Sequence, residues 1–161
     1  MAFTTANLCD TYSKTQHLQI AEPLFISYGA KTVYSGQVTT IKTFEDNVLI
    51  STVLQEPGHQ RILVIDGGGS RRCALVDASM AQTAIANGWE GIIINGCIRD
   101  AALIAKLPIG IRALQTHPLK THKQDHSDRD QLISFAGVNF KKDSFLYADM
   151  DGIIVSDTIL S

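Results

Sequence analysis

The chain has 161 residues, of which 45% are hydrophobic and 19% charged, and this length is typical of one domain with a sizeable core. Its 14 Lys and Arg against 16 Asp and Glu residues give a formal net charge of −2, which excludes the broad positive surface of a non-specific nucleic-acid binder. Because no apolar stretch approaches the roughly 20 residues of a membrane span, we expect one domain over residues 1–161 without a membrane or direct nucleic-acid partner.

The first half of the chain predicts short helices that alternate with strands. Before the first buried strand we expect a helix over residues 8–12, a strand over 32–43 interrupted at Ser35–Gly36, and a helix over 47–54. Residues 61–65 are mostly apolar, as in strands buried on both faces. They end at Asp66, which precedes three glycines.

The second half begins with a predicted helix over residues 78–87. Asp77 or Ser79 is a natural cap at its start, and Gly88 stands where a left-handed residue ends a helix. A buried strand over residues 90–95 follows, which predicts a βαβ unit with a right-handed parallel crossover. The remaining segments are a helix over 101–106, a strand over 109–113, and antiparallel strands over 131–140, 145–148 and 152–156. The fold class is therefore α/β.

A polar segment between Thr116 and Asp130 is dense in charge and histidine. We expect it to be a solvated loop. His122 and His126 are four residues apart, so on a helix they would share a face and could bind a metal together with Asp125. Nothing else in the sequence supports that site, because metal-binding histidines need further groups to orient them.

The three cysteines are odd in number and lack CxxC spacing: Cys9, Cys73 and Cys97. This pattern favours reduced thiols in a cytoplasmic chain over a disulfide or zinc framework. The N-terminus also lacks the basic and apolar regions of a secretory signal. Cys97 has no histidine near it in sequence, so we expect a small core residue rather than a nucleophile.

Candidate chemistry lies after the two buried strands, because ligands of open α/β sheets collect beyond the carboxyl ends of parallel strands. The glycines at 67–69 match neither the dinucleotide nor the phosphate-loop pattern. They predict either a tight turn or a close approach of a ligand. The free amides at the start of the helix that begins near Ala78 are a better anion site, and a carboxylate could bind there.

Arg99 and Asp100 follow the second buried strand and form the sharpest local pair. Arginine offers a planar fork for a carboxylate, and aspartate offers an oxygen ligand for Mg²⁺ or Mn²⁺. The alternative is structural: the pair caps the following helix, for which Asp100 is well placed.

Blocks along nearly the whole chain resemble the RraA family, the regulators of ribonuclease E activity and their RraA-like relatives. The matching stretches are Leu8–Asp10, Glu22–Phe25, Ser35–Val38, Phe44–Asn47, Val64–Ser70, Ala74–Ala78, Trp89–Gly91 and Leu146–Asp149. The resemblance implies a swivelling β/β/α domain and a ring-shaped homotrimer with clefts between subunits.

The resemblance implies two functions. One branch of the family consists of divalent-metal 4-hydroxy-4-methyl-2-oxoglutarate aldolases that also decarboxylate oxaloacetate; the other binds and inhibits ribonuclease E. In the lyase branch, the arginine of an Arg-Asp pair binds the pyruvyl substrate, the aspartate holds the metal, and a helix start supplies backbone contacts. These positions match Arg99 and Asp100 as catalytic residues, Asp100 as metal ligand, and Asp77, Ala78, Ser79 and Met80 as substrate-binding residues.

The chain also departs from both branches. Lyases of the family typically carry an acid at the helix start where this chain has Ala78, and regulators tend to lose the acid that is Asp100 here. The charged segment from Lys120 to Asp130 replaces a glycine-rich loop of the regulators. A quinone methyltransferase is not supported, because no glycine-rich motif typical of S-adenosylmethionine binding is present. The sequence therefore favours a Mg²⁺- or Mn²⁺-dependent lyase on a small 2-oxo acid, with ribonuclease E regulation as the alternative.

Overall fold

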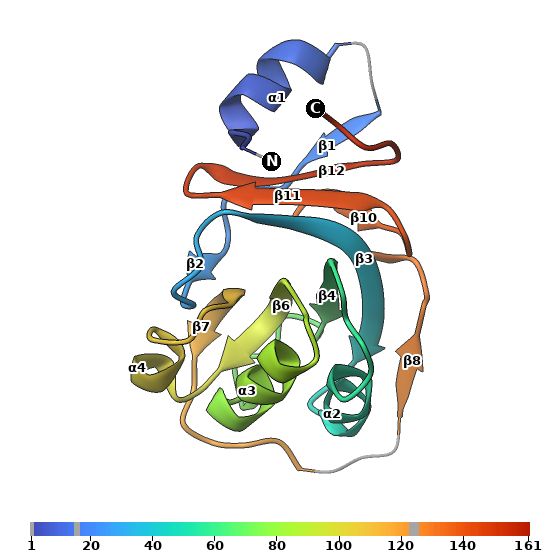
Figure 1. Cartoon of the computed structure of the whole chain (residues 1–161). Helices are drawn as coiled ribbons and strands as arrows, with labels where there is room; N and C mark the ends of the chain where they lie inside the picture. Colours follow the sequence, from blue (N-terminus) through green and yellow to red (C-terminus); the bar gives the residue numbers. More distant parts are fainter. Residues whose placement is uncertain (1, 15–16, 123–125) are drawn as a thin grey trace.

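A computed structural model describes residues 2–14, 17–122 and 126–161, and its main feature is a large mixed sheet (Figure 1). The hydrogen-bonded strands follow the order β1 (Leu18–Ile20), β12 (Gly152–Ser156), β11 (Phe145–Asp149), β3 (Tyr34–Thr43), β4 (Arg61–Asp66), β6 (Gly91–Ile98), β7 (Gly110–Thr116) and β2 (Ile26–Ser27). In addition, β5 (Ala74–Val76) pairs with β6, and β8 (Ser127–Arg129) pairs with β3.

The centre of the sheet is parallel, with β3, β4, β6 and β7 side by side. Helices α2 (Val48–Leu54), α3 (Ala78–Ala86) and α4 (Ala101–Ile104) contribute to the core on one face, and α1 (Thr5–Tyr12) packs beside β11 and β12 (Figure 1). The hairpin of β9 (Ile133–Phe135) and β10 (Val138–Phe140) contributes to the core on the other face.

Alternation along the central strands explains their apolar sequences. In β4, Leu63 and Ile65 pack on the helix side, whereas Ile62 and Val64 pack on the hairpin side. Successive strand residues point to opposite faces, so a strand covered on both faces needs apolar residues at consecutive positions. The predicted βαβ unit is confirmed, since β4 and β6 are parallel neighbours with α3 between them in sequence.

The helix caps follow the predicted chemistry. The Asp77 carboxylate accepts a hydrogen bond from the Met80 amide at 2.9 Å, as an N-cap does. Gly88 has φ +84, which is the left-handed conformation that glycine adopts at little cost. Trp89 is buried, and its indole N–H donates to the Glu56 carbonyl.

Several predicted boundaries were wrong. The strand over residues 34–43 is continuous at Ser35–Gly36, because β11 pairs with it there. Strand β6 runs on to Ile98, since an irregularity after Ile94 lets it pair with both β5 and β7. The predicted strand over residues 131–140 is a hairpin, with Ala136 and Gly137 in positive-φ conformations at its turn.

Short strands escaped prediction altogether. These are β1, β2, β5 and β8, each of two or three residues. Strand β8 lies inside the segment that was predicted as a solvated loop, where Ser127 pairs with Thr43 of β3. Two or three residues carry too little periodicity to be recognised, so only their partners in the sheet define them.

Buried Asp149 at the end of β11 holds the start of α1. Its two carboxylate oxygens accept hydrogen bonds from the Thr5 hydroxyl at 2.6 Å and the Thr5 amide at 2.7 Å. Burial raises the pKa of Asp149, but the hydrogen bonds from Thr5, Asp151 and Gly152 together bring the pKa below its ordinary value. The ionised carboxylate therefore stabilises the contact between α1 and the sheet.

We expect Asp149→Asn to lower the free energy of unfolding by about 1–3 kcal/mol, because a buried charged acceptor is lost. The pKa of Asp149 is lower in the folded protein than in the unfolded chain, where it is about 3.9. Asp149 therefore contributes fully to the free energy of unfolding above the unfolded pKa, and this contribution is lost as the pH falls through the native pKa. Urea unfolding of the wild type and the variant should thus converge in acid. A difference that stays constant down to about pH 3 would contradict this role.

No helix in the described part of the chain is both long enough and apolar enough to cross a membrane.

Candidate functional site

The predicted Arg-Asp pair lies where β6 ends, beside the start of α3. Strand β5 pairs with the last residues of β6 and leads directly into α3. The amide of Arg99 donates to the Val76 carbonyl at 3.0 Å, which joins the two chain segments. Residues 77–80 and residues 99–100, which are 19 to 23 positions apart in sequence, thus lie side by side.

Two carboxylates occupy the N-terminus of α3. Asp100 accepts a hydrogen bond from the Ala78 amide through Oδ2 at 3.0 Å, and Asp77 accepts one from the Met80 amide through Oδ1. This placement follows from the partial positive charge of a helix start. The predicted anion site is therefore filled in part by side chains of the protein itself. The amide of Ser79 donates to no group of the described residues.

The conformation of Asp100 corrects the structural alternative. Asp100 stands at the N-cap position of α4, but its side chain makes no capping hydrogen bond to that helix. Its carboxylate instead reaches the amide of Ala78 in α3. Asp100 also has φ +62 and ψ +38, a left-handed conformation that costs a non-glycine residue energy and recurs at functional sites. Simple capping of the following helix does not explain this residue.

Arg99 lies against Asp77. Its Nη2 is 3.7 Å from Asp77 Oδ2, and both side chains are partly exposed. Its Nη1 donates to the Pro118 carbonyl at 3.5 Å. These contacts are long, and the side chain is 31% exposed, so part of the N–H fork of Arg99 is available to a bound carboxylate.

The other predicted substrate-binding residues differ in what they can offer. The side chains of Ala78 and Met80 are buried in the core, so only their backbone could contact a ligand. Since both of those amides are already bonded to carboxylates, Ser79 is the exposed member of the group with a free amide. The structure brings all six predicted residues together at the start of α3 and the end of β6.

The glycine loop is a tight turn. The amides of Gly67 and Gly69 both donate to the Asn95 carbonyl at 3.1 Å, and the Gly68 amide donates to the Asp66 carboxylate at 2.9 Å. Gly68 and Gly69 have positive φ angles, which explains the choice of glycine. Because the amides of Gly67, Gly68 and Gly69 already donate to Asn95 and Asp66, the alternative of a ligand cradle loses its donors.

Cys97 is fully buried, as expected of a core residue. Burial raises the pKa of its thiol, whereas a nucleophilic cysteine needs a lowered pKa.

The histidine-rich metal site gains no support. In the described residues, no three His, Cys, Asp or Glu side chains gather as a metal-binding group. Asp125 lies outside the described residues. His126 instead lines a small pocket with Lys42 and Asp128 near the glycine loop.

Two neighbouring residues were missed from sequence. His117 and Pro118 follow β7, and the His117 amide donates to the Ile98 carbonyl at 2.9 Å beside Arg99. The ring Nδ1 of His117 accepts from the Leu119 amide at 3.1 Å, so a neutral ring carries its proton on Nε2. The available signal was position alone, because His117 follows the third strand of the predicted parallel set.

The protein is of the α/β class, with a large mixed sheet and an Arg-Asp pair that follows a buried parallel strand. A family model described as "RraA-like: Aldolase/RraA" matches residues 5–155, and the chain belongs to this RraA-like family. It is 55% identical over 157 residues to a Methylococcus capsulatus protein described as "Putative 4-hydroxy-4-methyl-2-oxoglutarate aldolase", with 98% of each chain covered. A Hahella chejuensis protein of the same description is 46% identical over 161 residues, which cover 100% of this chain and 97% of the relative.

Two solved structures share the fold closely. One is the RNA-processing inhibitor RraA from Thermus thermophilus, with a TM-score of 0.94, 35% identity, and coverage of 100% of this chain and 96% of that chain. The other, from Geobacillus kaustophilus, is described as an S-adenosylmethionine: 2-dimethylmenaquinone methyltransferase, with a TM-score of 0.93, 43% identity, and coverage of 98% and 97%. These matches agree with the large mixed sheet described above.

Proposed function

We propose that this chain is a divalent-metal-dependent C–C lyase that acts on pyruvyl 2-oxo acids, as a 4-hydroxy-4-methyl-2-oxoglutarate aldolase and oxaloacetate decarboxylase. The observation that carries the proposal is the meeting of Arg99 and Asp100 with Asp77 at the start of α3. The descriptions of the relatives from Methylococcus capsulatus and Hahella chejuensis support the same reaction class.

The residues present fit a hydrated Mg²⁺ or Mn²⁺ ion. Asp100 is exposed and uses only Oδ2 within the protein, so Oδ1 is available as a ligand. Mg²⁺ is usually bound by one or two carboxylates and keeps several water molecules, which agrees with a site that has few protein ligands. In this proposal Asp100 holds the ion. A bound ion would supply Lewis-acid stabilisation of the negative charge that develops on the 2-oxo group.

The chain's own residues bind and orient the substrate. Arg99 binds the substrate carboxylate through its guanidinium fork, and Asp77 at 3.7 Å restrains the orientation of that fork. The free Ser79 amide is a further donor for a substrate oxygen at the positive end of α3. Together these groups hold the scissile bond in a fixed orientation, which is itself a large part of catalysis.

Proton transfer distinguishes the two reactions. Aldol cleavage requires a base that removes the proton of the 4-hydroxyl group, whereas decarboxylation does not. Ala78 provides no acid at the helix start, and its methyl group is buried. Asp77 already bonds to the Met80 amide through one oxygen and faces Arg99 with the other. Because the proposal assigns Asp100 to the metal, the described site offers no further carboxylate for the aldol step.

We expect pyruvate release from oxaloacetate to exceed release from 4-hydroxy-4-methyl-2-oxoglutarate by about tenfold or more, since general-base catalysis typically contributes 10²–10⁴-fold. The measurement uses both substrates with Mg²⁺ and with EDTA, and it subtracts the rate of the metal alone. Equal turnover of both substrates would show that a base is present after all. No turnover of either above the background would overturn the lyase proposal.

Ribonuclease regulation is the second candidate function. The close fold match to the inhibitor RraA from Thermus thermophilus favours it. This function predicts that the chain binds ribonuclease E irrespective of Asp100. Failure of the two proteins to co-purify at micromolar concentration would argue against it, whereas binding by both the wild type and Asp100→Ala would support it.

Assembly and location follow the same family argument. We infer a ring-shaped homotrimer of swivelling β/β/α domains, each one domain over residues 1–161, in the cytoplasm. Sedimentation analysis of the purified chain measures the subunit number directly.

A further inference from the structure

Arg112 in the middle of β7 is a buried cation without a counterion. Its side chain is only 6% exposed, and no carboxylate of the described residues lies within 4 Å of its guanidinium. Nη2 donates to the backbone carbonyl of Asp149, while Nε has no partner. Burying a charge without an opposite charge is costly, so this arrangement is unusual for a purely structural residue.

The neighbouring acid does not neutralise Arg112. Both oxygens of the Asp149 carboxylate are taken by Thr5, and only the carbonyl of Asp149 faces the guanidinium. The hydroxyl of Tyr34 lies beside the Arg112 side chain, and neither this hydroxyl nor Nε of Arg112 has another partner in the described residues. Burial raises the pKa of Tyr34 to about 12 even though the positive charge of Arg112 lowers it, so the phenol stays neutral. No acid of the described residues therefore forms an ion pair with Arg112.

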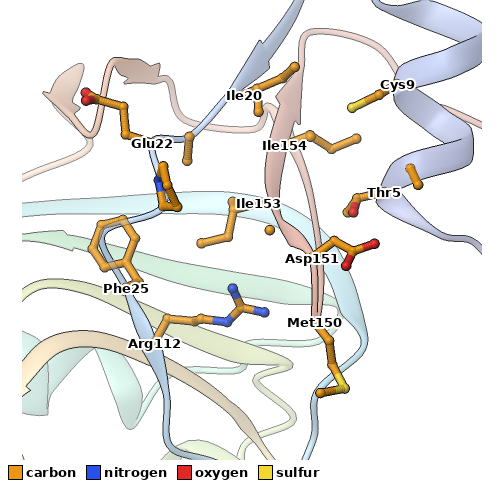
Figure 2. A pocket seen from close by; sticks show the side chains of 14 residues that line it. Thr5, Cys9, Ile20, Glu22, Phe25, Arg112, Met150, Asp151, Ile153 and Ile154 are labelled. Carbon is orange, nitrogen blue, oxygen red and sulfur yellow. The ribbon is translucent and has the colours of Figure 1, made fainter.

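Arg112 lines a pocket of about 330 Å³, which is within the range of small-ligand sites. Figure 2 shows its guanidinium extending into the space between Phe25 and Met150, with Ile153 nearby. The pocket lies between α1, the segment before β2, and the turn that joins β11 to β12. It is formed by different residues from those of the Arg99–Asp100 site.

The lining of the pocket indicates the class of ligand. Apolar side chains such as Phe25, Ile153 and Ile154 form most of its wall. The two other charged lining residues, Glu22 and Asp151, are both acidic and exposed, and Figure 2 shows the Glu22 carboxylate pointing away from Arg112. One buried cation suits one negative charge, and exposed acids at the rim repel a second negative charge.

We propose that the Arg112 pocket binds a small organic monocarboxylate with a short apolar body. The carboxylate would pair with the part of the guanidinium that faces the pocket, and the apolar body would lie against Phe25 and Ile153. Selectivity against dicarboxylates distinguishes this pocket from the Arg99–Asp100 site, whose proposed substrates carry two carboxylates. The inference does not depend on the proposed lyase activity.

Calorimetric titration of the purified protein with isovalerate tests the proposal, with succinate as the dicarboxylate comparison. We expect saturable binding of one isovalerate per chain, and binding of succinate weaker by at least about tenfold at this pocket. Arg112→Met should weaken isovalerate binding by at least about tenfold. Arg99→Met should leave isovalerate binding unchanged, which separates the pocket from the candidate active site.

A second variant keeps the test valid if Arg112→Met fails to fold. Gly152 lines the pocket, and a Cβ placed there would meet no atom within 4 Å. Gly152→Leu should therefore add apolar bulk at the pocket without a clash while retaining Arg112, and isovalerate binding should weaken. Gln82→Leu is the matched control, because Gln82 is exposed on α3 and is not among the residues that line the pocket.

Three results would each overturn the proposal. The first is the absence of saturable isovalerate binding, which is also expected if a second copy of the chain closes the pocket. The second is unchanged isovalerate binding in a folded Gly152→Leu variant. The third is loss of isovalerate binding in Arg99→Met.

Discussion

Asp100→Ala is expected to lower metal-dependent pyruvate release from oxaloacetate by roughly 100-fold or more. A Lewis-acid metal contributes several kcal/mol to the stabilisation of the transition state, and each 1.36 kcal/mol corresponds to a factor of about ten in rate. Asp100 is the only residue of the site to which the proposal assigns the metal, and one of its oxygens is free for that purpose. Initial rates with saturating Mg²⁺, corrected for the metal-only reaction, measure the effect.

The same substitution also removes a structural contact, so a matched variant is needed. Asp100 accepts a hydrogen bond from the Ala78 amide, and loss of that bond could disturb the start of α3. Asp100→Asn keeps an oxygen acceptor at this position but removes the negative charge that attracts a divalent ion. We expect Asp100→Asn to retain the thermal stability of the wild type and to lose turnover as Asp100→Ala does. Turnover close to wild type in either variant would contradict the assignment of the metal ligand.

Arg99→Met is expected to lower kcat/KM for oxaloacetate by roughly 100-fold, mainly through a higher KM. A hydrogen-bonded pair between arginine and carboxylate contributes more than a neutral hydrogen bond, about 1.5–3 kcal/mol. The guanidinium of Arg99 has only long contacts, with Asp77 at 3.7 Å and the Pro118 carbonyl at 3.5 Å. Removing it should therefore cost the folded protein little.

Arg99→Lys separates charge from geometry. Lysine keeps the positive charge but cannot form the two parallel hydrogen bonds of a guanidinium, so we expect a loss of roughly tenfold in kcat/KM. Steady-state kinetics of the wild type and both variants provide the comparison. If Arg99→Lys and Arg99→Met lose activity equally, the planar fork is essential. If neither loses activity, the substrate carboxylate is bound elsewhere.

The sequence was sufficient for much of the fold because its signals were local. The apolar run of β4 between Arg61 and Asp66, the cap at Asp77 and the left-handed Gly88 each act within a few residues. Such features depend on backbone sterics and nearby hydrogen bonds, which a single segment contains. The pair of Arg99 and Asp100 was also visible, because it directly follows an apolar strand.

Tertiary structure alone decided what those residues contact. The structural alternative from sequence was that Asp100 caps the helix that follows it, yet its carboxylate bonds to the Ala78 amide of α3. This contact depends on β5, a strand of three residues that brings the start of α3 beside the end of β6. Pairing between segments distant in sequence leaves no periodic signal in either of them, so periodicity could not predict it.

Arg112 shows the same division most clearly. In sequence it is one arginine inside a strand, with nothing to distinguish it from the exposed cations. Only the packing of distant segments around β7, among them the end of β11 and the β11–β12 turn, removes it from water and leaves it without a counterion. Sequence determines the strand and the charge, because both are properties of local residues. Burial and the absence of a partner arise only when distant segments pack around that charge, since desolvation depends on every neighbour at once.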